Sequence, residues 1–140
     1  MTFKYSICYP DKKNIEYRNN IISGKDVLKI AENYPWTQQL DLSESINQNE
    51  VYYSPSLDFK CIENERSFCL TAMYDEQKKL VFSIWYNRPK KVKVLFGLFG
   101  ESEKMIVDDY WTLNFDDAVK YFQYFVEGHY EKIEELYKKS

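Results

Sequence analysis

The strongest constraint on the fold is a series of segments in the second half of the chain in which apolar and polar residues alternate. Residues 67–74 and 80–86 each place four apolar side chains on one face: Phe68, Leu70, Ala72 and Tyr74, then Leu80, Phe82, Ile84 and Tyr86. A period of two is typical of strands with one buried face. The connections between these segments are short, whereas parallel strands need a crossover of about a dozen residues. The pattern therefore predicts an antiparallel meander.

Further strands are expected on both sides of this pair. Residues 2–9 alternate, residues 15–18 could return as the second arm of a hairpin, and more strand patterns occur at 51–60, 91–98 and 104–111. Pro55 implies a bulge or an edge position, because proline cannot donate to a strand ladder. We expect an α+β fold built on an antiparallel meander sheet of about five to six strands.

Two helices are expected to accompany the sheet. Ser23 and Asp26 form a helix-start signature before a short amphipathic helix that ends at Pro35. Asn114 and Asp117 repeat this signature before a long C-terminal helix packed on the sheet. The apolar stripe of that helix contains Ala118, Phe122, Phe125, His129, Ile133 and Leu136, and Gly128 could divide it. Residues 37–50 are polar and are interpreted as an irregular connection.

Length and composition favour one domain over residues 1–140 with a full hydrophobic core. No apolar run is long enough to span a bilayer, and the first residues alternate where a secretory signal would be continuously apolar. We therefore expect a cytoplasmic protein without a membrane association. Cys8, Cys61 and Cys69 show no Cys-x-x-Cys spacing, so they are expected to be buried thiols.

Residues for catalysis are scarce. His129 is the single histidine, and its place on the apolar stripe predicts a packed, hydrogen-bonded side chain. Asp108, Asp109, Asp116 and Asp117 lie close in sequence, but helix capping and solvated charge explain them better than a metal site. We expect a protein that is not an enzyme, with no catalytic residues, cofactor or metal.

Charge is unevenly distributed. Residues 77–100 contain six basic residues and no acid, which we attribute to protection of a sheet edge, and nucleic-acid binding is the less favoured reading. Residues 37–65 and 101–117 each contain six acids and one base. These acidic stretches are interleaved with aromatic residues that include Trp36, Tyr52, Tyr53, Tyr110 and Trp111. Acids with aromatic anchors favour a surface that binds a basic protein.

The second half of the chain resembles the immunity proteins of bacterial toxin systems in its order of elements. The similarity covers the strands at 68–75 and 80–87 and the helix that opens at Leu113-Asn114-Phe115-Asp116-Asp117-Ala118. The resemblance implies a non-catalytic inhibitor that occludes the active site of a basic toxin. The predicted contact residues are Asp41, Glu44, Glu50, Tyr52, Tyr53, Asp108, Asp109 and Tyr110.

Another class of function remains open. A small-molecule-binding or enzymatic domain would have an aromatic-lined pocket between the sheet and the C-terminal helix, with polar groups converging near His129. Binding of nucleic acid through the basic strands would show salt-sensitive retention on an oligonucleotide column.

Overall fold

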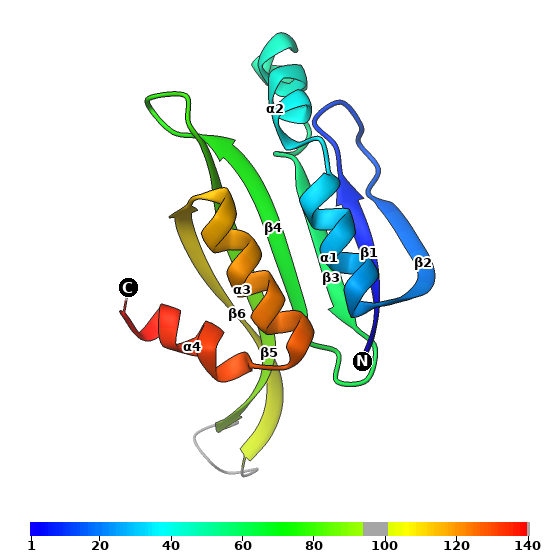
Figure 1. Cartoon of the computed structure of the whole chain (residues 1–140), viewed down its shortest axis with the longest axis vertical. Coiled ribbons are helices and arrows are strands. Elements are labelled where there is room, and N and C mark those ends of the chain that lie inside the picture. The colour runs from blue at the N-terminus through cyan, green and yellow to red at the C-terminus, as the bar shows by residue number, and fades with distance from the viewer. Residues whose placement is uncertain (94–100, 140) are drawn as a thin grey trace.

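The protein is an α+β fold of six strands and four α-helices in the part of the chain that the structure describes (Figure 1). This computed structural model describes the backbone of residues 1–93 and 101–139 and the side chains of residues 1–87 and 113–137. The strands are β1 (Thr2–Cys8), β2 (Glu16–Ser23), β3 (Ser56–Cys61), β4 (Ser67–Tyr74), β5 (Leu80–Lys93) and β6 (Glu101–Leu113). The helices are α1 (Gly24–Asn33), α2 (Trp36–Ser45), the 3-10 helix η1 (Gln48–Glu50), α3 (Phe115–Glu127) and α4 (Tyr130–Lys139).

The strands form one sheet in the order β2-β1-β3-β4-β5-β6, and every neighbouring pair is antiparallel. The expected antiparallel sheet is confirmed, and β3 to β6 form the expected meander. The first half differs from a simple meander because β1 lies between β2 and β3. The chain must therefore cross from β2, on one side of β1, to β3, on the other side. The helices α1 and α2 form this connection.

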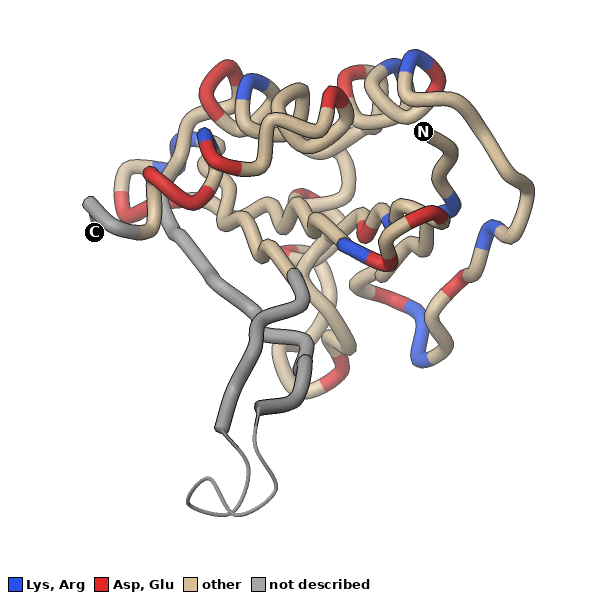
Figure 2. The backbone as a smooth tube through the Cα atoms, turned by 90° about the horizontal axis from the view of Figure 1, so that it is seen from below, with Lys and Arg blue, Asp and Glu red and all other residues tan. Residues whose placement is uncertain are grey.

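One face of the sheet is covered by helices. Figures 1 and 2 show α1, α3 and α4 as a layer over this face. Phe59 and Phe68 point toward this layer, and their rings lie 4.6 Å and 5.6 Å from that of Phe122. All three side chains have no exposed surface. Burial of apolar area of this kind contributes roughly 25 cal/mol per Å² and is the main stabilising term.

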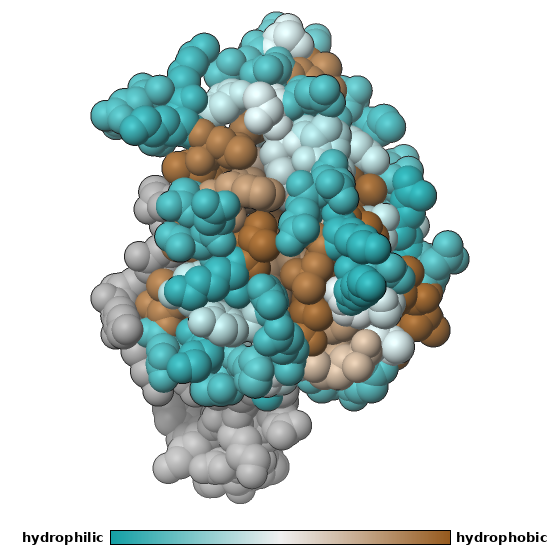
Figure 3. Space-filling model, viewed as in Figure 1, coloured by the Kyte–Doolittle hydropathy of each residue, from teal (hydrophilic) through white to brown (hydrophobic). Residues whose placement is uncertain are grey.

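The outer side of the helical layer is polar. Figure 3 shows hydrophilic residues over the helices and apolar residues in the middle of the face, between α1 and α3. Here the two helices approach closely: a Cβ on Gly24 would lie 2.5 Å from Cγ1 of Val126. A larger residue at position 24 would therefore require the Val126 side chain or the helices themselves to shift.

Both expected helix starts are confirmed. The Ser23 hydroxyl accepts a hydrogen bond from the Asp26 N–H at 3.3 Å, and Oδ1 of Asn114 accepts one from the Asp117 N–H at 2.8 Å. These bonds satisfy amides that have no partner within the first turn of a helix. Side-chain capping therefore sets the N-terminal boundaries of α1 and α3.

The expected single C-terminal helix is two helices, α3 and α4. Gly128 adopts φ 82°, and the N–H groups of Gly128 and His129 donate to the carbonyls of Phe125 and Tyr124. This pair of bonds is a Schellman motif, which ends a helix at a left-handed residue. The break moves His129 into the connection, where its side chain is 55% exposed and lies 3.6 Å from Glu127 and 3.8 Å from Glu131. The prediction of a packed histidine is wrong for this reason.

Residues 37–50 are also more regular than expected, because α2 and η1 occupy most of them. The Pro35 carbonyl accepts a hydrogen bond from the Gln39 N–H at 3.0 Å. Pro35 therefore lies between the two helices, after the end of α1 and directly before α2. Trp36 and Leu40, one turn apart, are buried and attach α2 to the core. Trp36 is therefore a core residue and not part of an aromatic surface.

The strand expected at 91–98 is not separate. Residues 80–93 form the continuous strand β5, and residues 94–98 lie outside the described part of the chain. Pro89 lies within β5 beyond Asn87, the last residue paired with β4. From there on β5 has only β6 as a described partner, so proline removes less hydrogen bonding than it would in a central strand.

Candidate functional site

Five of the predicted contact residues lie in one stretch that includes α2, η1 and the segment after them. We call residues 36–53 the acidic end. Figure 1 shows α2 at the same end of the molecule as the β1–β2 and β4–β5 turns. Asp41, Glu44, Glu50 and Tyr52 are exposed, and the Tyr52 side chain retains 54% of its surface. Residues 30–59 contain five acids and no Lys, Arg or His.

Two contacts join α2 to the β4–β5 turn. The Tyr74 hydroxyl donates a hydrogen bond to Oδ1 of Asp41 at 2.8 Å, and this bond raises the pKa of Tyr74. Nζ of Lys78 lies 3.6 Å from Oε2 of Glu44. Both partners of this ion pair are largely exposed, so it contributes less than about 1 kcal/mol. The carboxylate of Glu44 therefore stays available to a stronger partner.

The tyrosines of the acidic end contact the β1–β2 turn. The Tyr52 N–H donates to the Pro10 carbonyl at 2.9 Å, and the Tyr53 hydroxyl donates to the Lys13 carbonyl at 2.9 Å. These bonds hold the segment after η1 in one conformation while the Tyr52 ring projects into solvent.

The other three predicted contact residues lie on β6. In the strand register, Asp108, Asp109 and Tyr110 face Tyr86, Trp85 and Ile84 of β5. Their side chains lie outside the described part of the structure. Of the eight predicted contact residues, the acidic end therefore contains the other five.

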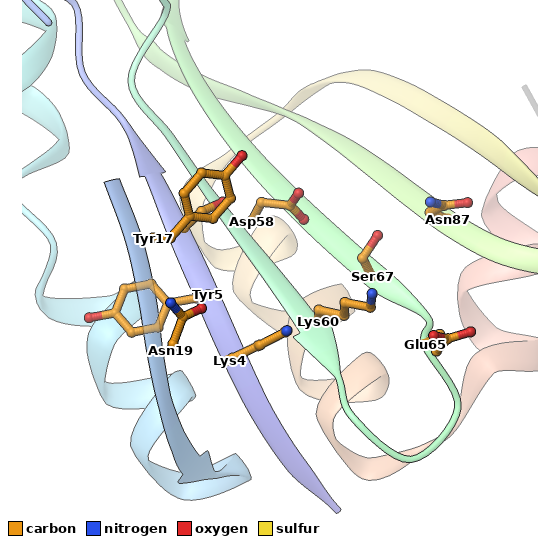
Figure 4. Close-up of a pocket in the computed structure, with 10 residues that line it drawn as sticks. Lys4, Tyr5, Tyr17, Asn19, Asp58, Lys60, Glu65, Ser67 and Asn87 are labelled. Atoms are coloured by element: carbon orange, nitrogen blue, oxygen red, sulfur yellow. The ribbon is translucent and has the colours of Figure 1, made fainter. Parts of the chain in front are cut away.

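A second candidate site is a hollow of about 360 Å³ on the face of the sheet opposite the helices, at the β2–β1–β3–β4 side (Figure 4). It contains no residue of the predicted contact set. Ten residues line it: Lys4, Tyr5, Ser6, Tyr17, Asn19, Asp58, Lys60, Glu65, Ser67 and Asn87. Alternation places Lys4, Ser6, Asp58, Lys60 and Ser67 on one face of their strands, but their assembly depends on the pairing of β1 with β3, which the sequence did not predict.

Direct cross-strand partners arrange the hollow in two rows. Lys4, Lys60, Ser67 and Asn87 follow one another as partners from β1 to β5. The second row lies two residues away from the first along β1, β3 and β4. It runs from β2 to β4 through Tyr17, Ser6, Asp58 and Cys69. Rows separated by two residues lie roughly 7 Å apart. The first row thus contains two lysines on neighbouring strands, and the second contains a carboxylate.

The Asp58 carboxyl is exposed, yet the surrounding sheet desolvates it and raises its pKa, an effect that the charge of Lys60 partly offsets. Burial also raises the pKa of the neighbouring Cys69 to about 12, and the charge of Asp58 adds to this increase. The Cys69 thiol is therefore protonated at neutral pH and is a weak nucleophile.

Like charges directly opposite on a sheet are destabilising, and Lys4 and Lys60 are such a pair. We predict that Lys4→Glu raises the free energy of unfolding by about 0.5 kcal/mol at low ionic strength, because it converts repulsion into attraction. Urea unfolding measures this change. The gain should shrink in about 1 M NaCl, where screening is strong. Lys4→Glu combined with Lys60→Glu restores a like-charge pair and should remove the gain; a gain that persists would contradict the prediction.

The space between the sheet and α3 is filled by phenylalanine rings, as described above. His129 is exposed beside Glu127 and Glu131. Among the described side chains, no group of three or more His, Cys, Asp or Glu is placed to hold a metal ion. None of the helices within residues 1–93 and 101–139 combines the length and apolar character that a bilayer crossing requires.

No protein-family model, curated protein or solved structure matches the chain.

Proposed function

We propose that the protein is a non-catalytic inhibitor of the immunity type that binds a basic protein, such as a toxin, through its acidic end. The observation that carries this proposal is that residues 30–59 contain no base while Asp41, Glu44 and Glu50 are exposed. Carboxylates on such a surface accelerate and orient the encounter with a basic partner. The exposed Tyr52 ring supplies the kind of aromatic contact that dominates binding energy at interfaces.

The acidic end is also well ordered before it meets a partner. Trp36 anchors α2 in the core, and hydrogen bonds from Tyr74 and Tyr53 attach this region to two neighbouring turns. A surface held in one conformation loses little entropy on binding. By contrast, Figure 2 shows acids and bases intermixed over the helical layer, which gives that layer no single sign of charge.

The test uses the product of the neighbouring coding sequence as the partner, since immunity genes typically lie beside the toxin gene. Binding is measured by calorimetry with the wild-type chain and with Asp41→Lys, Glu44→Lys and Glu50→Lys combined. We expect the triple variant to bind at least about 100-fold more weakly, because three attractions become repulsions. Wild-type affinity should also fall as salt is raised.

A matched control keeps the same change in net charge on another surface: Glu127→Lys, Glu131→Lys and Glu135→Lys combined. These three glutamates are exposed on α3 and α4. The control should bind within about threefold of the wild type if local charge is what matters. Equal losses in the two triple variants would show that only net charge acts, and absence of any complex would reject the proposed partner class.

A further inference from the structure

The hollow on the open sheet face has a first row made of hydrogen-bond donors. Lys4 and Lys60 supply ammonium groups, and Ser67 supplies a hydroxyl. Figure 4 shows the ends of both lysine side chains on the side of Ser67, with the Lys60 nitrogen below the Ser67 hydroxyl. No acidic side chain in the described part of the chain lies within 4.0 Å of either ammonium group. Lys4 and Lys60 are therefore direct cross-strand neighbours of like charge, and the more distant Asp58 carboxylate offsets the charge of Lys60 in part.

Such a pair is unfavourable unless something compensates it. An oxyanion between the two lysines would convert their repulsion into two charge-assisted hydrogen bonds, and the Ser67 hydroxyl could donate a third. The residues stand on neighbouring strands of one sheet, which fixes the spacing of their backbones before a ligand arrives.

The hollow also contains acceptors that an anion alone would not satisfy. Asn87 continues the row beyond Ser67, but its Oδ1, which has no hydrogen-bond partner among the described residues, is shielded from solvent and is not reached from the hollow. Asp58 stands in the second row and forms no ion pair within the described part of the chain. The Asp58 carboxylate accepts hydrogen bonds only, so it indicates that a ligand in the hollow would bring hydroxyl donors.

We propose that this hollow binds a small polyhydroxylated molecule that carries a phosphate or carboxylate group. The oxyanion lies between Lys4 and Lys60, and a hydroxyl group donates to Asp58. The volume of about 360 Å³ falls within the range of small-molecule sites. The lining contains two lysines against Asp58 and Glu65, so it is not a uniformly positive surface of the kind that follows a nucleic-acid backbone. This site is separate from the acidic end and does not depend on its proposed function.

The test is a titration of the ¹⁵N-labelled full chain, followed by amide chemical shifts. Four probes separate the two halves of the ligand: ribose 5-phosphate, gluconate, inorganic phosphate and ribose. We expect saturable amide shifts at Lys4, Lys60 and Ser67 with ribose 5-phosphate, with gluconate or with both. Tighter binding of ribose 5-phosphate would identify phosphate as the preferred anion, and tighter binding of gluconate would identify carboxylate. Inorganic phosphate and ribose should each bind at least tenfold more weakly than the better of the two.

Two charge reversals provide the control. Lys4→Glu should weaken binding of the better probe at least tenfold, whereas Lys132→Glu on exposed α4 should change it less than twofold. Since Lys4→Glu is expected to stabilise the fold, loss of binding in this variant cannot be attributed to unfolding. No saturable shift with any probe, or equal weakening by the two reversals, would overturn the proposal. Inorganic phosphate binding as tightly as ribose 5-phosphate would overturn the assignment of hydroxyl contacts.

Discussion

Replacement of Phe125 with alanine is expected to lower the free energy of unfolding by about 4 kcal/mol. Phe125 of α3 has no exposed surface, and five rings surround it at centroid distances from 5.4 to 6.4 Å. These rings belong to Phe3, Phe68, Tyr86, Phe122 and Tyr130, which come from three strands, α3 and α4. Removal of the ring leaves a cavity that rigid strands cannot close, so the full transfer and cavity costs apply.

Urea unfolding followed by circular dichroism measures this loss. Phe125→Leu keeps much of the volume and should cost less than about 2 kcal/mol. Gln123→Ala, on the exposed side of the same helix, removes only a hydrogen bond to Glu127 and should cost about 0.5 kcal/mol. If Phe125→Ala proved as mild as Gln123→Ala, the aromatic cluster would not be the centre of the core.

The fold could be predicted wherever one physical signal dominated a segment. Alternation identified residues 67–74 as a strand with the observed bounds, and the caps at Ser23 and Asn114 identified the starts of α1 and α3. The helix α2 was missed because only Trp36 and Leu40 of its ten residues are buried, too few to make a visible apolar stripe. The crossover that places β1 between β2 and β3 is a long-range choice made by packing, which leaves no local pattern.

The candidate sites show the same division. Charge counts along the chain identified Asp41, Glu44 and Glu50, which share one segment and are exposed. Trp36 was assigned to that surface from its position in the sequence, yet it is only 4% exposed. The assignment was wrong because two apolar residues one helical turn apart do not show whether they anchor a helix in the core or lie on its surface. The rows of the hollow depend on register between β1 and β3, segments about 50 residues apart, so Lys4 and Lys60 could not be paired from sequence alone.

Replacement of Trp36 with alanine is expected to cost about 3 to 4 kcal/mol and to affect the acidic end directly. The indole Nε1–H donates to the Ala31 carbonyl at 3.0 Å, and the ring lies 5.0 Å from Phe82 and 4.6 Å from Tyr34. It therefore joins the start of α2 both to the end of α1 and to the sheet. Without this anchor, the first turn of α2 loses its attachment to the core, and local opening of the helix becomes easier.

Amide hydrogen exchange separates this local effect from global loss of stability. In Trp36→Ala, protection should fall throughout the chain by the global amount and fall further over residues 36–45, whereas Phe125→Ala should lower it without such a local excess. Trp36→Phe keeps a ring but loses the hydrogen bond to Ala31 and should cost about half as much. If α2 orders the carboxylates of Asp41 and Glu44 for a basic partner, Trp36→Ala should also weaken that binding more than Phe125→Ala does under conditions where both remain folded. Equal exchange profiles in the two variants would mean that Trp36 supports the core in general and not the acidic end in particular.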